Sequence, residues 1–198
     1  MTSLKELTKD HHTNAERQEF VNVLMSGNIN PKFYAIYLFN QFTKYSLLED
    51  LIAANIPSSR GLFQQIERRY KIHDDYIELW DDPANPPELL EATHKYMQRL
   101  IQFATDDKTD KNLLLAHMYV LHMGDLSGGQ MIAKKVPGEG RMYKFNEDTE
   151  VLKDKIRELL AGKEGLLAEE SKFVFNCATE LFQELMELDI EHYLESSD

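Results

Sequence analysis

The stretch MGDLSGGQ, Met123–Gln130, lies in a segment whose flanking residues have the apolar spacing of a helix. Gly124, Gly128 and Gly129 lie close together in it. Each interior glycine costs a helix about 1 kcal/mol relative to alanine, so their clustering implies that something is gained from the missing side chains. One explanation is close packing between helices, which small residues four positions apart allow. The other is a flat ligand pressed against bare backbone.

Helical geometry places the glycines on one side of their helix. At about 100° per residue, a single stripe contains His117, Leu121, Gly124, Gly128 and Met131. The stripe is apolar apart from His117, and its middle is bare backbone. Packing alone would not require a further glycine, Gly129, next to Gly128, or the polar residues Asp125 and Ser127 between Gly124 and Gly128. The pattern therefore favours a flat ligand, with room for something small between it and the helix.

Composition sets broad limits on the protein class. A chain of 198 residues is most simply one domain, residues 1–198, and its single cysteine, Cys177, excludes an internal disulfide. The formal net charge of −12 argues against nucleic acid as a partner. The chain has no basic, apolar leader and no apolar run of about 18 residues. We therefore expect an untargeted, cytoplasmic protein that does not enter a membrane.

The apolar period is helical along the whole chain, and no alternating strand pattern appears. A capping box of Ser3 and Glu6 predicts the first helix start, Asn30 and Pro31 predict the second, and Asp110 predicts the fifth. The expected helices span about 3–27, 31–55, 62–80, 88–104, 110–137, 147–160 and 168–194. With short connections between them, they predict a single all-α domain.

Two neighbouring histidines of the first helix fall on different faces. His11 lies on the apolar face and is expected to point into the core, together with Leu4, Leu7 and Ala15. His12 lies on a polar face, together with Lys5, Lys9 and Glu16. Such a group can simply form solvated pairs between successive turns. Alternatively, it offers an imidazole to a metal and two cations to the carboxylates of a metal-containing ligand.

Two phrases carry a family resemblance. TKDHHTNAE and LLLAHMYVLHMGDLSGGQ resemble the haem oxygenase family, and order and spacing match from about Leu4 to Tyr193. The resemblance implies an all-α fold in which haem is sandwiched between a proximal N-terminal helix and a kinked, glycine-rich distal helix. It assigns the proximal iron ligand to His12, a choice that periodicity leaves open.

The resemblance also implies the roles of the distal residues. Gly124 and Gly128 let the distal helix approach the porphyrin, which directs bound dioxygen toward one edge of the ring. Asp125 anchors ordered water near the oxygen, and this network can deliver a proton. We count these three residues as catalytic. Tyr45 and Tyr119 are the expected polar partners of the network.

The remaining assigned residues are expected to hold the haem. Glu16 would orient His12 through the free ring nitrogen. Two pairs of cationic side chains would bind the propionates, Lys5 with Lys9 and Lys153 with Arg157. Lys155 is an alternative to either member of the second pair. An aromatic residue of the last helix would form a wall of the pocket. The expected haem-binding residues are Lys5, Lys9, Glu16, Tyr119, Ser127, Gly129, Lys153, Arg157 and Phe175.

The chain departs from the animal members of the family beside the motif. They have HAYTRYLGDLSGGQ where this chain reads HMYVLHMGDLSGGQ. Leu121 replaces an arginine and His122 a tyrosine, so the polar contacts around the distal network must be rearranged. The hydrophobic membrane tail of the animal proteins is also missing, which indicates a soluble type.

The reaction implied is the oxidation of haem b, as both substrate and cofactor, by O2 to biliverdin, carbon monoxide and Fe2+, usually with opening at the α-meso carbon. No GxGxxG follows a strand, so electrons must come from an external donor such as ferredoxin or another soluble protein. An acidic donor requires a locally basic rim. Candidates for this rim are Lys5, Lys9, Lys134, Lys135, Lys153 and Arg157. A bilin reductase is a candidate downstream partner.

Two other classes remain open at this point. A non-catalytic haem-binding or haem-transfer protein needs His12 and the lysines but not the glycines and Asp125 together. A di-iron carboxylate bundle could use Glu91 and His94, with Asp189 and His192 as a second half. His117 lies upstream on the glycine stripe, where we expect a hydrogen-bonded core histidine.

Overall fold

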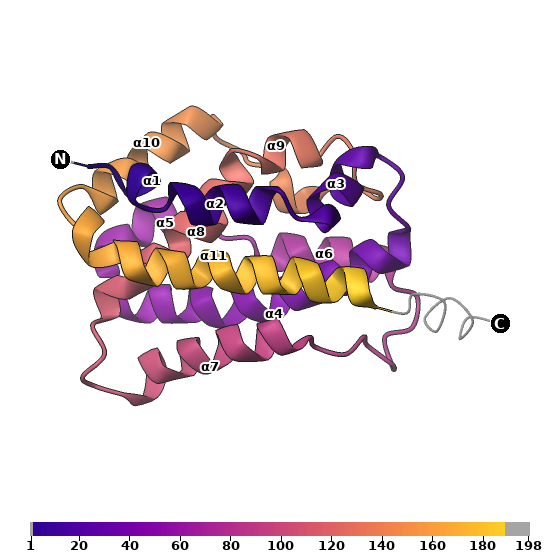
Figure 1. The fold of residues 1–198 in the computed structure, drawn as a ribbon, viewed down its shortest axis with the longest axis horizontal. Helices are drawn as coiled ribbons and strands as arrows, with labels where there is room; N and C mark the ends of the chain where they lie inside the picture. The colour runs from indigo at the N-terminus through magenta and orange to yellow at the C-terminus, as the bar shows by residue number, and fades with distance from the viewer. Residues whose placement is uncertain (1, 189–198) are drawn as a thin grey trace.

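The computed structural model describes residues 2–188, which form helices joined by short connections, with no strand in that range (Figure 1). This confirms the all-α prediction. The α-helices are α1 (Leu4–Leu7), α2 (Lys9–Glu16), α3 (Glu19–Ser26), α4 (Pro31–Asn55), α5 (Arg60–Ile66), α6 (Arg69–Leu79), α7 (Glu91–Thr105), α8 (Leu114–Leu126), α9 (Gly129–Ile132), α10 (Thr149–Leu160) and α11 (Glu164–Glu187). Short 3₁₀ turns are η1 (Pro57–Ser59), η2 (Lys111–Leu113) and η3 (Arg141–Tyr143).

Two long helices organise the core. Helix α4 is buried around its whole circumference from Phe33 to Leu38, and it contacts α6, α7 and α8. Helix α11, the yellow-orange helix crossing the middle of Figure 1, packs against α2, α3, α7 and α8. It thereby places the N-terminal helix α2 and the glycine-bearing helix α8 against one shared support. No helix within residues 2–188 has the length and apolar content needed to cross a membrane.

The predicted helix starts are present. The Ser3 hydroxyl accepts the Glu6 N–H while the Glu6 carboxylate accepts the Ser3 N–H, which is the predicted capping box. Asn30 accepts the backbone N–H groups of Lys32 and Phe33 at the start of α4. Asp110 caps the 3₁₀ turn that leads into α8.

The first predicted helix, 3–27, is wrong as a single element and forms α1, α2 and α3. At the first break the buried Thr8 hydroxyl donates to the Leu4 carbonyl oxygen, and Thr8 leaves helical geometry at φ −113° and ψ 5°. At the second break Gln18 is extended, with φ −64° and ψ 144°. Gly27 then ends α3 in the left-handed region at φ 77°, which glycine adopts without strain.

The third predicted helix, 62–80, is also wrong as a single element, because it breaks between α5 and α6. Glu67 is extended at ψ 139°. The carboxylate of Glu49 on α4 accepts the backbone N–H groups of Arg68 and Arg69 at 2.6 and 3.2 Å. A side chain from a distant part of the sequence thus caps the start of α6, which no local pattern reveals.

The other boundaries differ from the predictions by a few residues. Helix α7 begins at Glu91 instead of residue 88, because Leu90 is extended after the proline cluster. Helix α10 begins at Thr149, and α11 begins four residues earlier than predicted. The predicted end of the last helix, Leu194, lies outside the described residues. The fifth predicted helix, 110–137, is divided into η2, α8 and α9, and its division forms part of the site.

Candidate functional site

The three motif glycines have different surroundings. A Cβ atom added to Gly124 would meet nothing within 4 Å, and one added to Gly128 would meet only the Gly124 carbonyl oxygen, at 4.0 Å. Close packing between helices therefore does not explain these two glycines. A Cβ atom on Gly129 would lie 2.5 Å from the buried ring of Tyr143. This placement favours a packing role for Gly129 over the haem contact that the resemblance implies.

The glycine-bearing helix is broken inside the motif. Helix α8 ends at Leu126, Ser127 has φ −107° and ψ −92°, and α9 begins at Gly129. The exposed Ser127 donates its backbone N–H to the Gly124 carbonyl oxygen at 3.1 Å. The Gln130 amide donates to the carbonyl oxygens of Asp125 and Tyr143, so it ties the break to η3. Gln130 had no predicted role, although it closes the motif itself.

Asp125 is buried directly beside the open glycines. Its side chain is 6% exposed, and the Tyr45 hydroxyl on α4 donates to its Oδ2 atom at 2.7 Å. Burial raises the pKa of Asp125 to about 6, and the Tyr45 hydrogen bond together with the nearby His122 and Arg68 side chains opposes the rise. A carboxyl group with such a pKa can hold or release a proton near neutral pH. The structure thus contains the predicted contact between Tyr45 and Asp125.

Tyr119, the other tyrosine expected at Asp125, is placed differently. It is half-buried and lies beside Thr8, at the junction of α1 and α2; burial raises its pKa and the Thr8 hydroxyl opposes this. Within residues 2–188 no hydrogen bond joins Tyr119 to Asp125. The role of Tyr119 as a polar partner of the water network around Asp125 therefore stays a prediction, and its hydroxyl lies beside Thr8, on the side of the N-terminal helices.

On α2, His12 combines exposure with fixed orientation. Its side chain is 48% exposed, and its Nδ1 atom lies 3.3 Å from Glu16 Oε2. The imidazole ring meets the buried Phe175 ring of α11 edge to face, with centroids 5.5 Å apart. Because Nδ1 is held by Glu16, Nε2 is the nitrogen that a metal could bind. His11 is half-buried on a helix that packs against α11, so it lies at the edge of the core instead of deep within it.

The cations assigned to the haem carboxylates fall into two groups. Lys5 and Lys9 are exposed on α1 and α2, and neither forms an ion pair within the described range. Lys153 and Arg157 on α10 each pair with a carboxylate of their own helix, Glu150 and Asp154. Lys155 instead donates to Gln65 of α5 at 2.9 Å. The structure therefore leaves the N-terminal pair more available for a ligand than the α10 pair.

A second buried polar cluster lies near the start of α8. His117 is fully buried, with Nδ1 2.9 Å from the Tyr96 hydroxyl and Nε2 2.9 Å from Glu170 Oε1. Arg99 binds Glu170 with two nitrogens, at 2.7 and 2.6 Å. This confirms the prediction of a hydrogen-bonded core histidine.

The di-iron alternative finds no support in residues 2–188. Glu91 and His94 are both exposed on α7, and no group of three or more histidine, cysteine or acidic side chains in that range could hold a metal ion. The other half of that prediction, Asp189 and His192, lies outside the described residues.

These features define an all-α protein that presents an oriented, exposed histidine on one helix and bare backbone beside a buried carboxyl group of raised pKa on another. The chain belongs to the heme oxygenase family, whose model matches residues 1–188.

Individual relatives agree with this assignment. Bovine Heme oxygenase 1 is 32% identical over 138 residues, which cover 67% of this chain and 46% of the bovine protein. Heme oxygenase 2 of Macaca fascicularis is 30% identical over 163 residues, covering 74% of this chain and 50% of that protein. The chain thus spans about half the length of these curated relatives.

Solved structures show the same fold. A heme oxygenase from Leptospira interrogans has a TM-score of 0.78 at 27% identity, over 91% of this chain and 97% of the other. Heme oxygenase-1 of the cyanobacterium Synechocystis, solved in complex with heme, has a TM-score of 0.81 at 22% identity, over 98% of this chain and 97% of the other.

Proposed function

We propose that this chain is a haem-degrading enzyme that takes haem b as both cofactor and substrate and converts it, with O2 and external electrons, to biliverdin, carbon monoxide and Fe2+. The observation that carries the proposal is the open backbone of Gly124, beside which Asp125 is buried with a pKa of about 6. A protein that only carried haem would need neither feature.

The residues on the proximal side fit haem. His12 has one ring nitrogen held by Glu16 and the other available for iron, and Phe175 supports the imidazole ring. The ammonium groups of Lys5 and Lys9, which form no ion pair within residues 2–188, are suited to the propionate carboxylates. When bound, haem supplies the iron that activates dioxygen and the ring carbon that is oxidised.

The distal residues perform two tasks in this proposal. Gly124 and Gly128 allow a flat ring to reach van der Waals contact with the helix backbone, because neither residue places a side chain between the backbone and the ring. Asp125 holds a proton close to the ring. Tyr45 occupies its Oδ2 atom, so Oδ1 is the oxygen through which Asp125 can bind water and pass the proton on.

The finer features of the reaction are also proposals. We place ring opening at the α-meso carbon, as the family resemblance implies, and expect a bilin reductase to consume the biliverdin. We propose ferredoxin as the electron donor. The exposed Lys134 and Lys135, next to α9, and the exposed Lys5 and Lys9 offer an acidic donor a basic rim on a chain of net charge −12.

The deciding experiment is an absorption time course of the protein with one equivalent of haem in air. Ascorbate, or ferredoxin with its reductase, supplies electrons, and catalase removes free peroxide. We expect the Soret band to decay while a bilin spectrum grows. A stable haem spectrum would instead support the haem carrier, and the absence of any Soret shift would reject haem binding.

The iron ligand is tested by the pair His12→Ala and His11→Ala. We expect His12→Ala to weaken haem binding by more than the roughly 10–100-fold typical for residues that only orient a ligand, and to abolish turnover. Because His12 is 48% exposed, the fold should change in stability by less than about 0.5 kcal/mol. His11→Ala should bind and degrade haem as the unaltered protein does. The opposite pattern would assign the iron to His11.

The electron donor is tested by a salt series. Ferredoxin-driven turnover should fall as salt rises, since screening weakens the encounter between oppositely charged surfaces. Ascorbate-driven turnover serves as the control and should change little. Equal salt dependence of the two rates would contradict docking through the basic rim.

A further inference from the structure

Helices α4 and α8 are joined by two buried polar contacts, one turn apart. Tyr45 of α4 donates to Asp125 of α8 at 2.7 Å, and His122 of α8 pairs through Nε2 with Glu49 of α4 at 3.2 Å. Tyr45 and Glu49 are four residues apart, and Asp125 and His122 are three apart, so each helix presents both residues on one face. The first contact contains the carboxyl group of the proposed function; the second has no assigned role.

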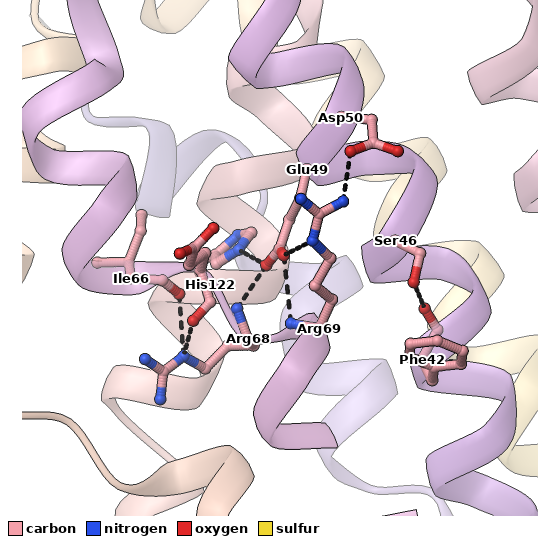
Figure 2. Close-up of polar contacts among 9 residues, drawn as sticks. Phe42, Ser46, Glu49, Asp50, Ile66, Arg68, Arg69 and His122 are labelled. Atoms are coloured by element: carbon pink, nitrogen blue, oxygen red, sulfur yellow. Dashed lines mark hydrogen bonds and ion pairs between the residues drawn. The ribbon is translucent and has the colours of Figure 1, made fainter. Parts of the chain in front are cut away.

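Glu49 is a rigid anchor for this second contact. It is fully buried, and besides His122 it accepts the backbone N–H groups of Arg68 and Arg69 at 2.6 and 3.2 Å (Figure 2). The Arg69 Nε atom lies 3.9 Å away on the same carboxylate. Because a carboxylate that receives these donors acts as an acceptor, the Nε2 atom of His122 carries the proton toward it.

The anchored imidazole packs against Tyr45. The two ring centroids lie 5.2 Å apart at an interplanar angle of 62°, and Phe63 of α5 contacts the imidazole from another side at 6.4 Å. His122 is fully buried, and its Nδ1 atom has no hydrogen-bond partner among the described residues. Among the described residues, the polar partner of His122 is thus Glu49 and its aromatic neighbours include Tyr45, whose hydroxyl donates to Asp125.

We propose that His122 is a positioning residue of the distal site: tied to Glu49 and packed on Tyr45, it holds the Tyr45 ring so that its hydroxyl donates to Asp125. The proposal rests on the proposed function only for the role of Asp125 in turnover. It goes beyond that function because it gives a role to Glu49 and His122. Within the described residues, neither side chain has a recorded contact with Gly124 or Gly128.

Other groups act on Asp125 and must be counted in any test. Tyr45, Glu49 and the buried Lys44 act from α4, His122 acts from α8, and Arg68 acts from the α5–α6 connection. Asp125 in turn acts on Tyr34, Tyr37 and Tyr143. Replacing His122 leaves all of the others in place. A change in the titration of Asp125 therefore reports the loss of His122, which acts on Asp125 through its own charge and through its packing on Tyr45.

The test compares His122→Phe with His117→Phe. Both remove a fully buried imidazole of α8 whose Nε2 atom pairs with a glutamate, but His117 pairs with Glu170, away from Asp125. The carboxyl carbon of Asp125 is followed by 13C NMR as a function of pH in the haem-free protein, with Asp125→Asn identifying its signal. We expect His122→Phe to move the titration to higher pH and His117→Phe to leave it unchanged.

A second variant guards against loss of folding. His122→Gln keeps an amide donor for Glu49 and removes the ring, so it should shift the Asp125 titration in the same direction by less than His122→Phe. In the haem-loaded protein, the pH profile of turnover should move in parallel. Equal shifts for the His122 and His117 variants, or no shift for either His122 variant, would overturn the proposal. A shift in a protein that does not degrade haem would reject the proposed function and leave the positioning role standing.

Discussion

Helix α8 carries the buried His117 near its start and the buried Asp125 near its end. The surroundings of these two residues have opposite effects on the pKa of the carboxyl group in each place, which is Glu170 at the start and Asp125 at the end. Burial alone would raise the pKa of Glu170, the partner of His117, yet the hydrogen bonds from His117 and Arg99 outweigh burial and lower it to about 2. Burial raises the pKa of Asp125 to about 6, since one tyrosine hydroxyl does not replace the lost water.

The difference separates a structural cluster at one end of α8 from the cluster at the other end that is proposed to be reactive. The folded state favours the ionised form of Glu170 and disfavours that of Asp125, so near neutral pH the first carboxylate stabilises the fold and the second destabilises it. A protein retains a destabilising group where chemistry needs it. The two ends of α8 therefore predict opposite results for the same kind of substitution.

The largest expected effect is that of Asp125→Asn. Tyr45 can still donate to the amide oxygen, so haem should bind, but turnover should fall by about 100-fold or more because no group holds the proton. The unaltered carboxyl has a pKa of 3.8 unfolded and about 6 folded, so it costs stability above pH 6 and nothing below pH 3.8. The variant should thus be more stable at pH 8, by up to about 3 kcal/mol.

Urea unfolding of the haem-free proteins measures this gain, which should shrink as the pH falls from about 6 to 4. A single-turnover assay measures the loss of activity. A variant that turns over haem normally, or that is less stable at pH 8, would break the contrast between the two ends of α8.

Glu170→Gln should have the opposite result. The folded pKa of about 2 lies below the unfolded 4.5, so this carboxylate stabilises the fold above pH 4.5 and loses its effect as the pH falls toward 2. The variant should lose about 3 kcal/mol at pH 7 while keeping its turnover number. Urea unfolding between pH 7 and 3 tests this, and a constant loss across that range would contradict it.

Much of the scaffold was predictable from local patterns. The helical period and the capping residues Ser3, Asn30 and Asp110 correctly predicted an all-α fold and three of its helix starts. These signals are local, because a cap and the N–H groups that it binds lie within a few residues of each other.

The features that escaped prediction depend on contacts between distant residues. The break between α5 and α6 is set by Glu49, which lies 19 residues before Arg68. Glu49 lies one turn after Tyr45, but Lys44 and Asp50 of the same helix are charged as well, so the sequence did not single out Glu49. The partners of Tyr119 and Lys155 likewise come from other helices, which spacing along one helix cannot reveal.

For the site, the clustered glycines located the motif, and helical spacing set Gly129 apart from the stripe that contains Gly124 and Gly128. Spacing could not show what each glycine faces. Gly124 and Gly129 are both helical and both lie in GDLSGGQ. Only the placement of Tyr143, from η3, shows that one faces open space and the other a ring.

The two glycines also provide the predictions with the smallest expected effects on the fold. Their alanine variants test the end of α8 that is proposed to be reactive. Gly129→Ala places a methyl group 2.5 Å from the ring of Tyr143, which is only 2% exposed, so the ring must move and stability should fall by about 1–3 kcal/mol. Gly124→Ala meets nothing within 4 Å, so the haem-free protein should be unchanged or more stable by up to about 1 kcal/mol.

The same two variants should reverse their order when haem is added. The Gly124→Ala methyl group enters the space that the ring is proposed to occupy, so haem affinity and turnover should fall although the fold is intact. Gly129→Ala should lose stability and keep its affinity. Thermal unfolding without haem and haem titration provide the two readouts. If Gly124→Ala were destabilised without haem and bound haem normally, the bare backbone would serve packing after all, and the reactive end of α8 would lose the feature that most distinguishes it from the structural end.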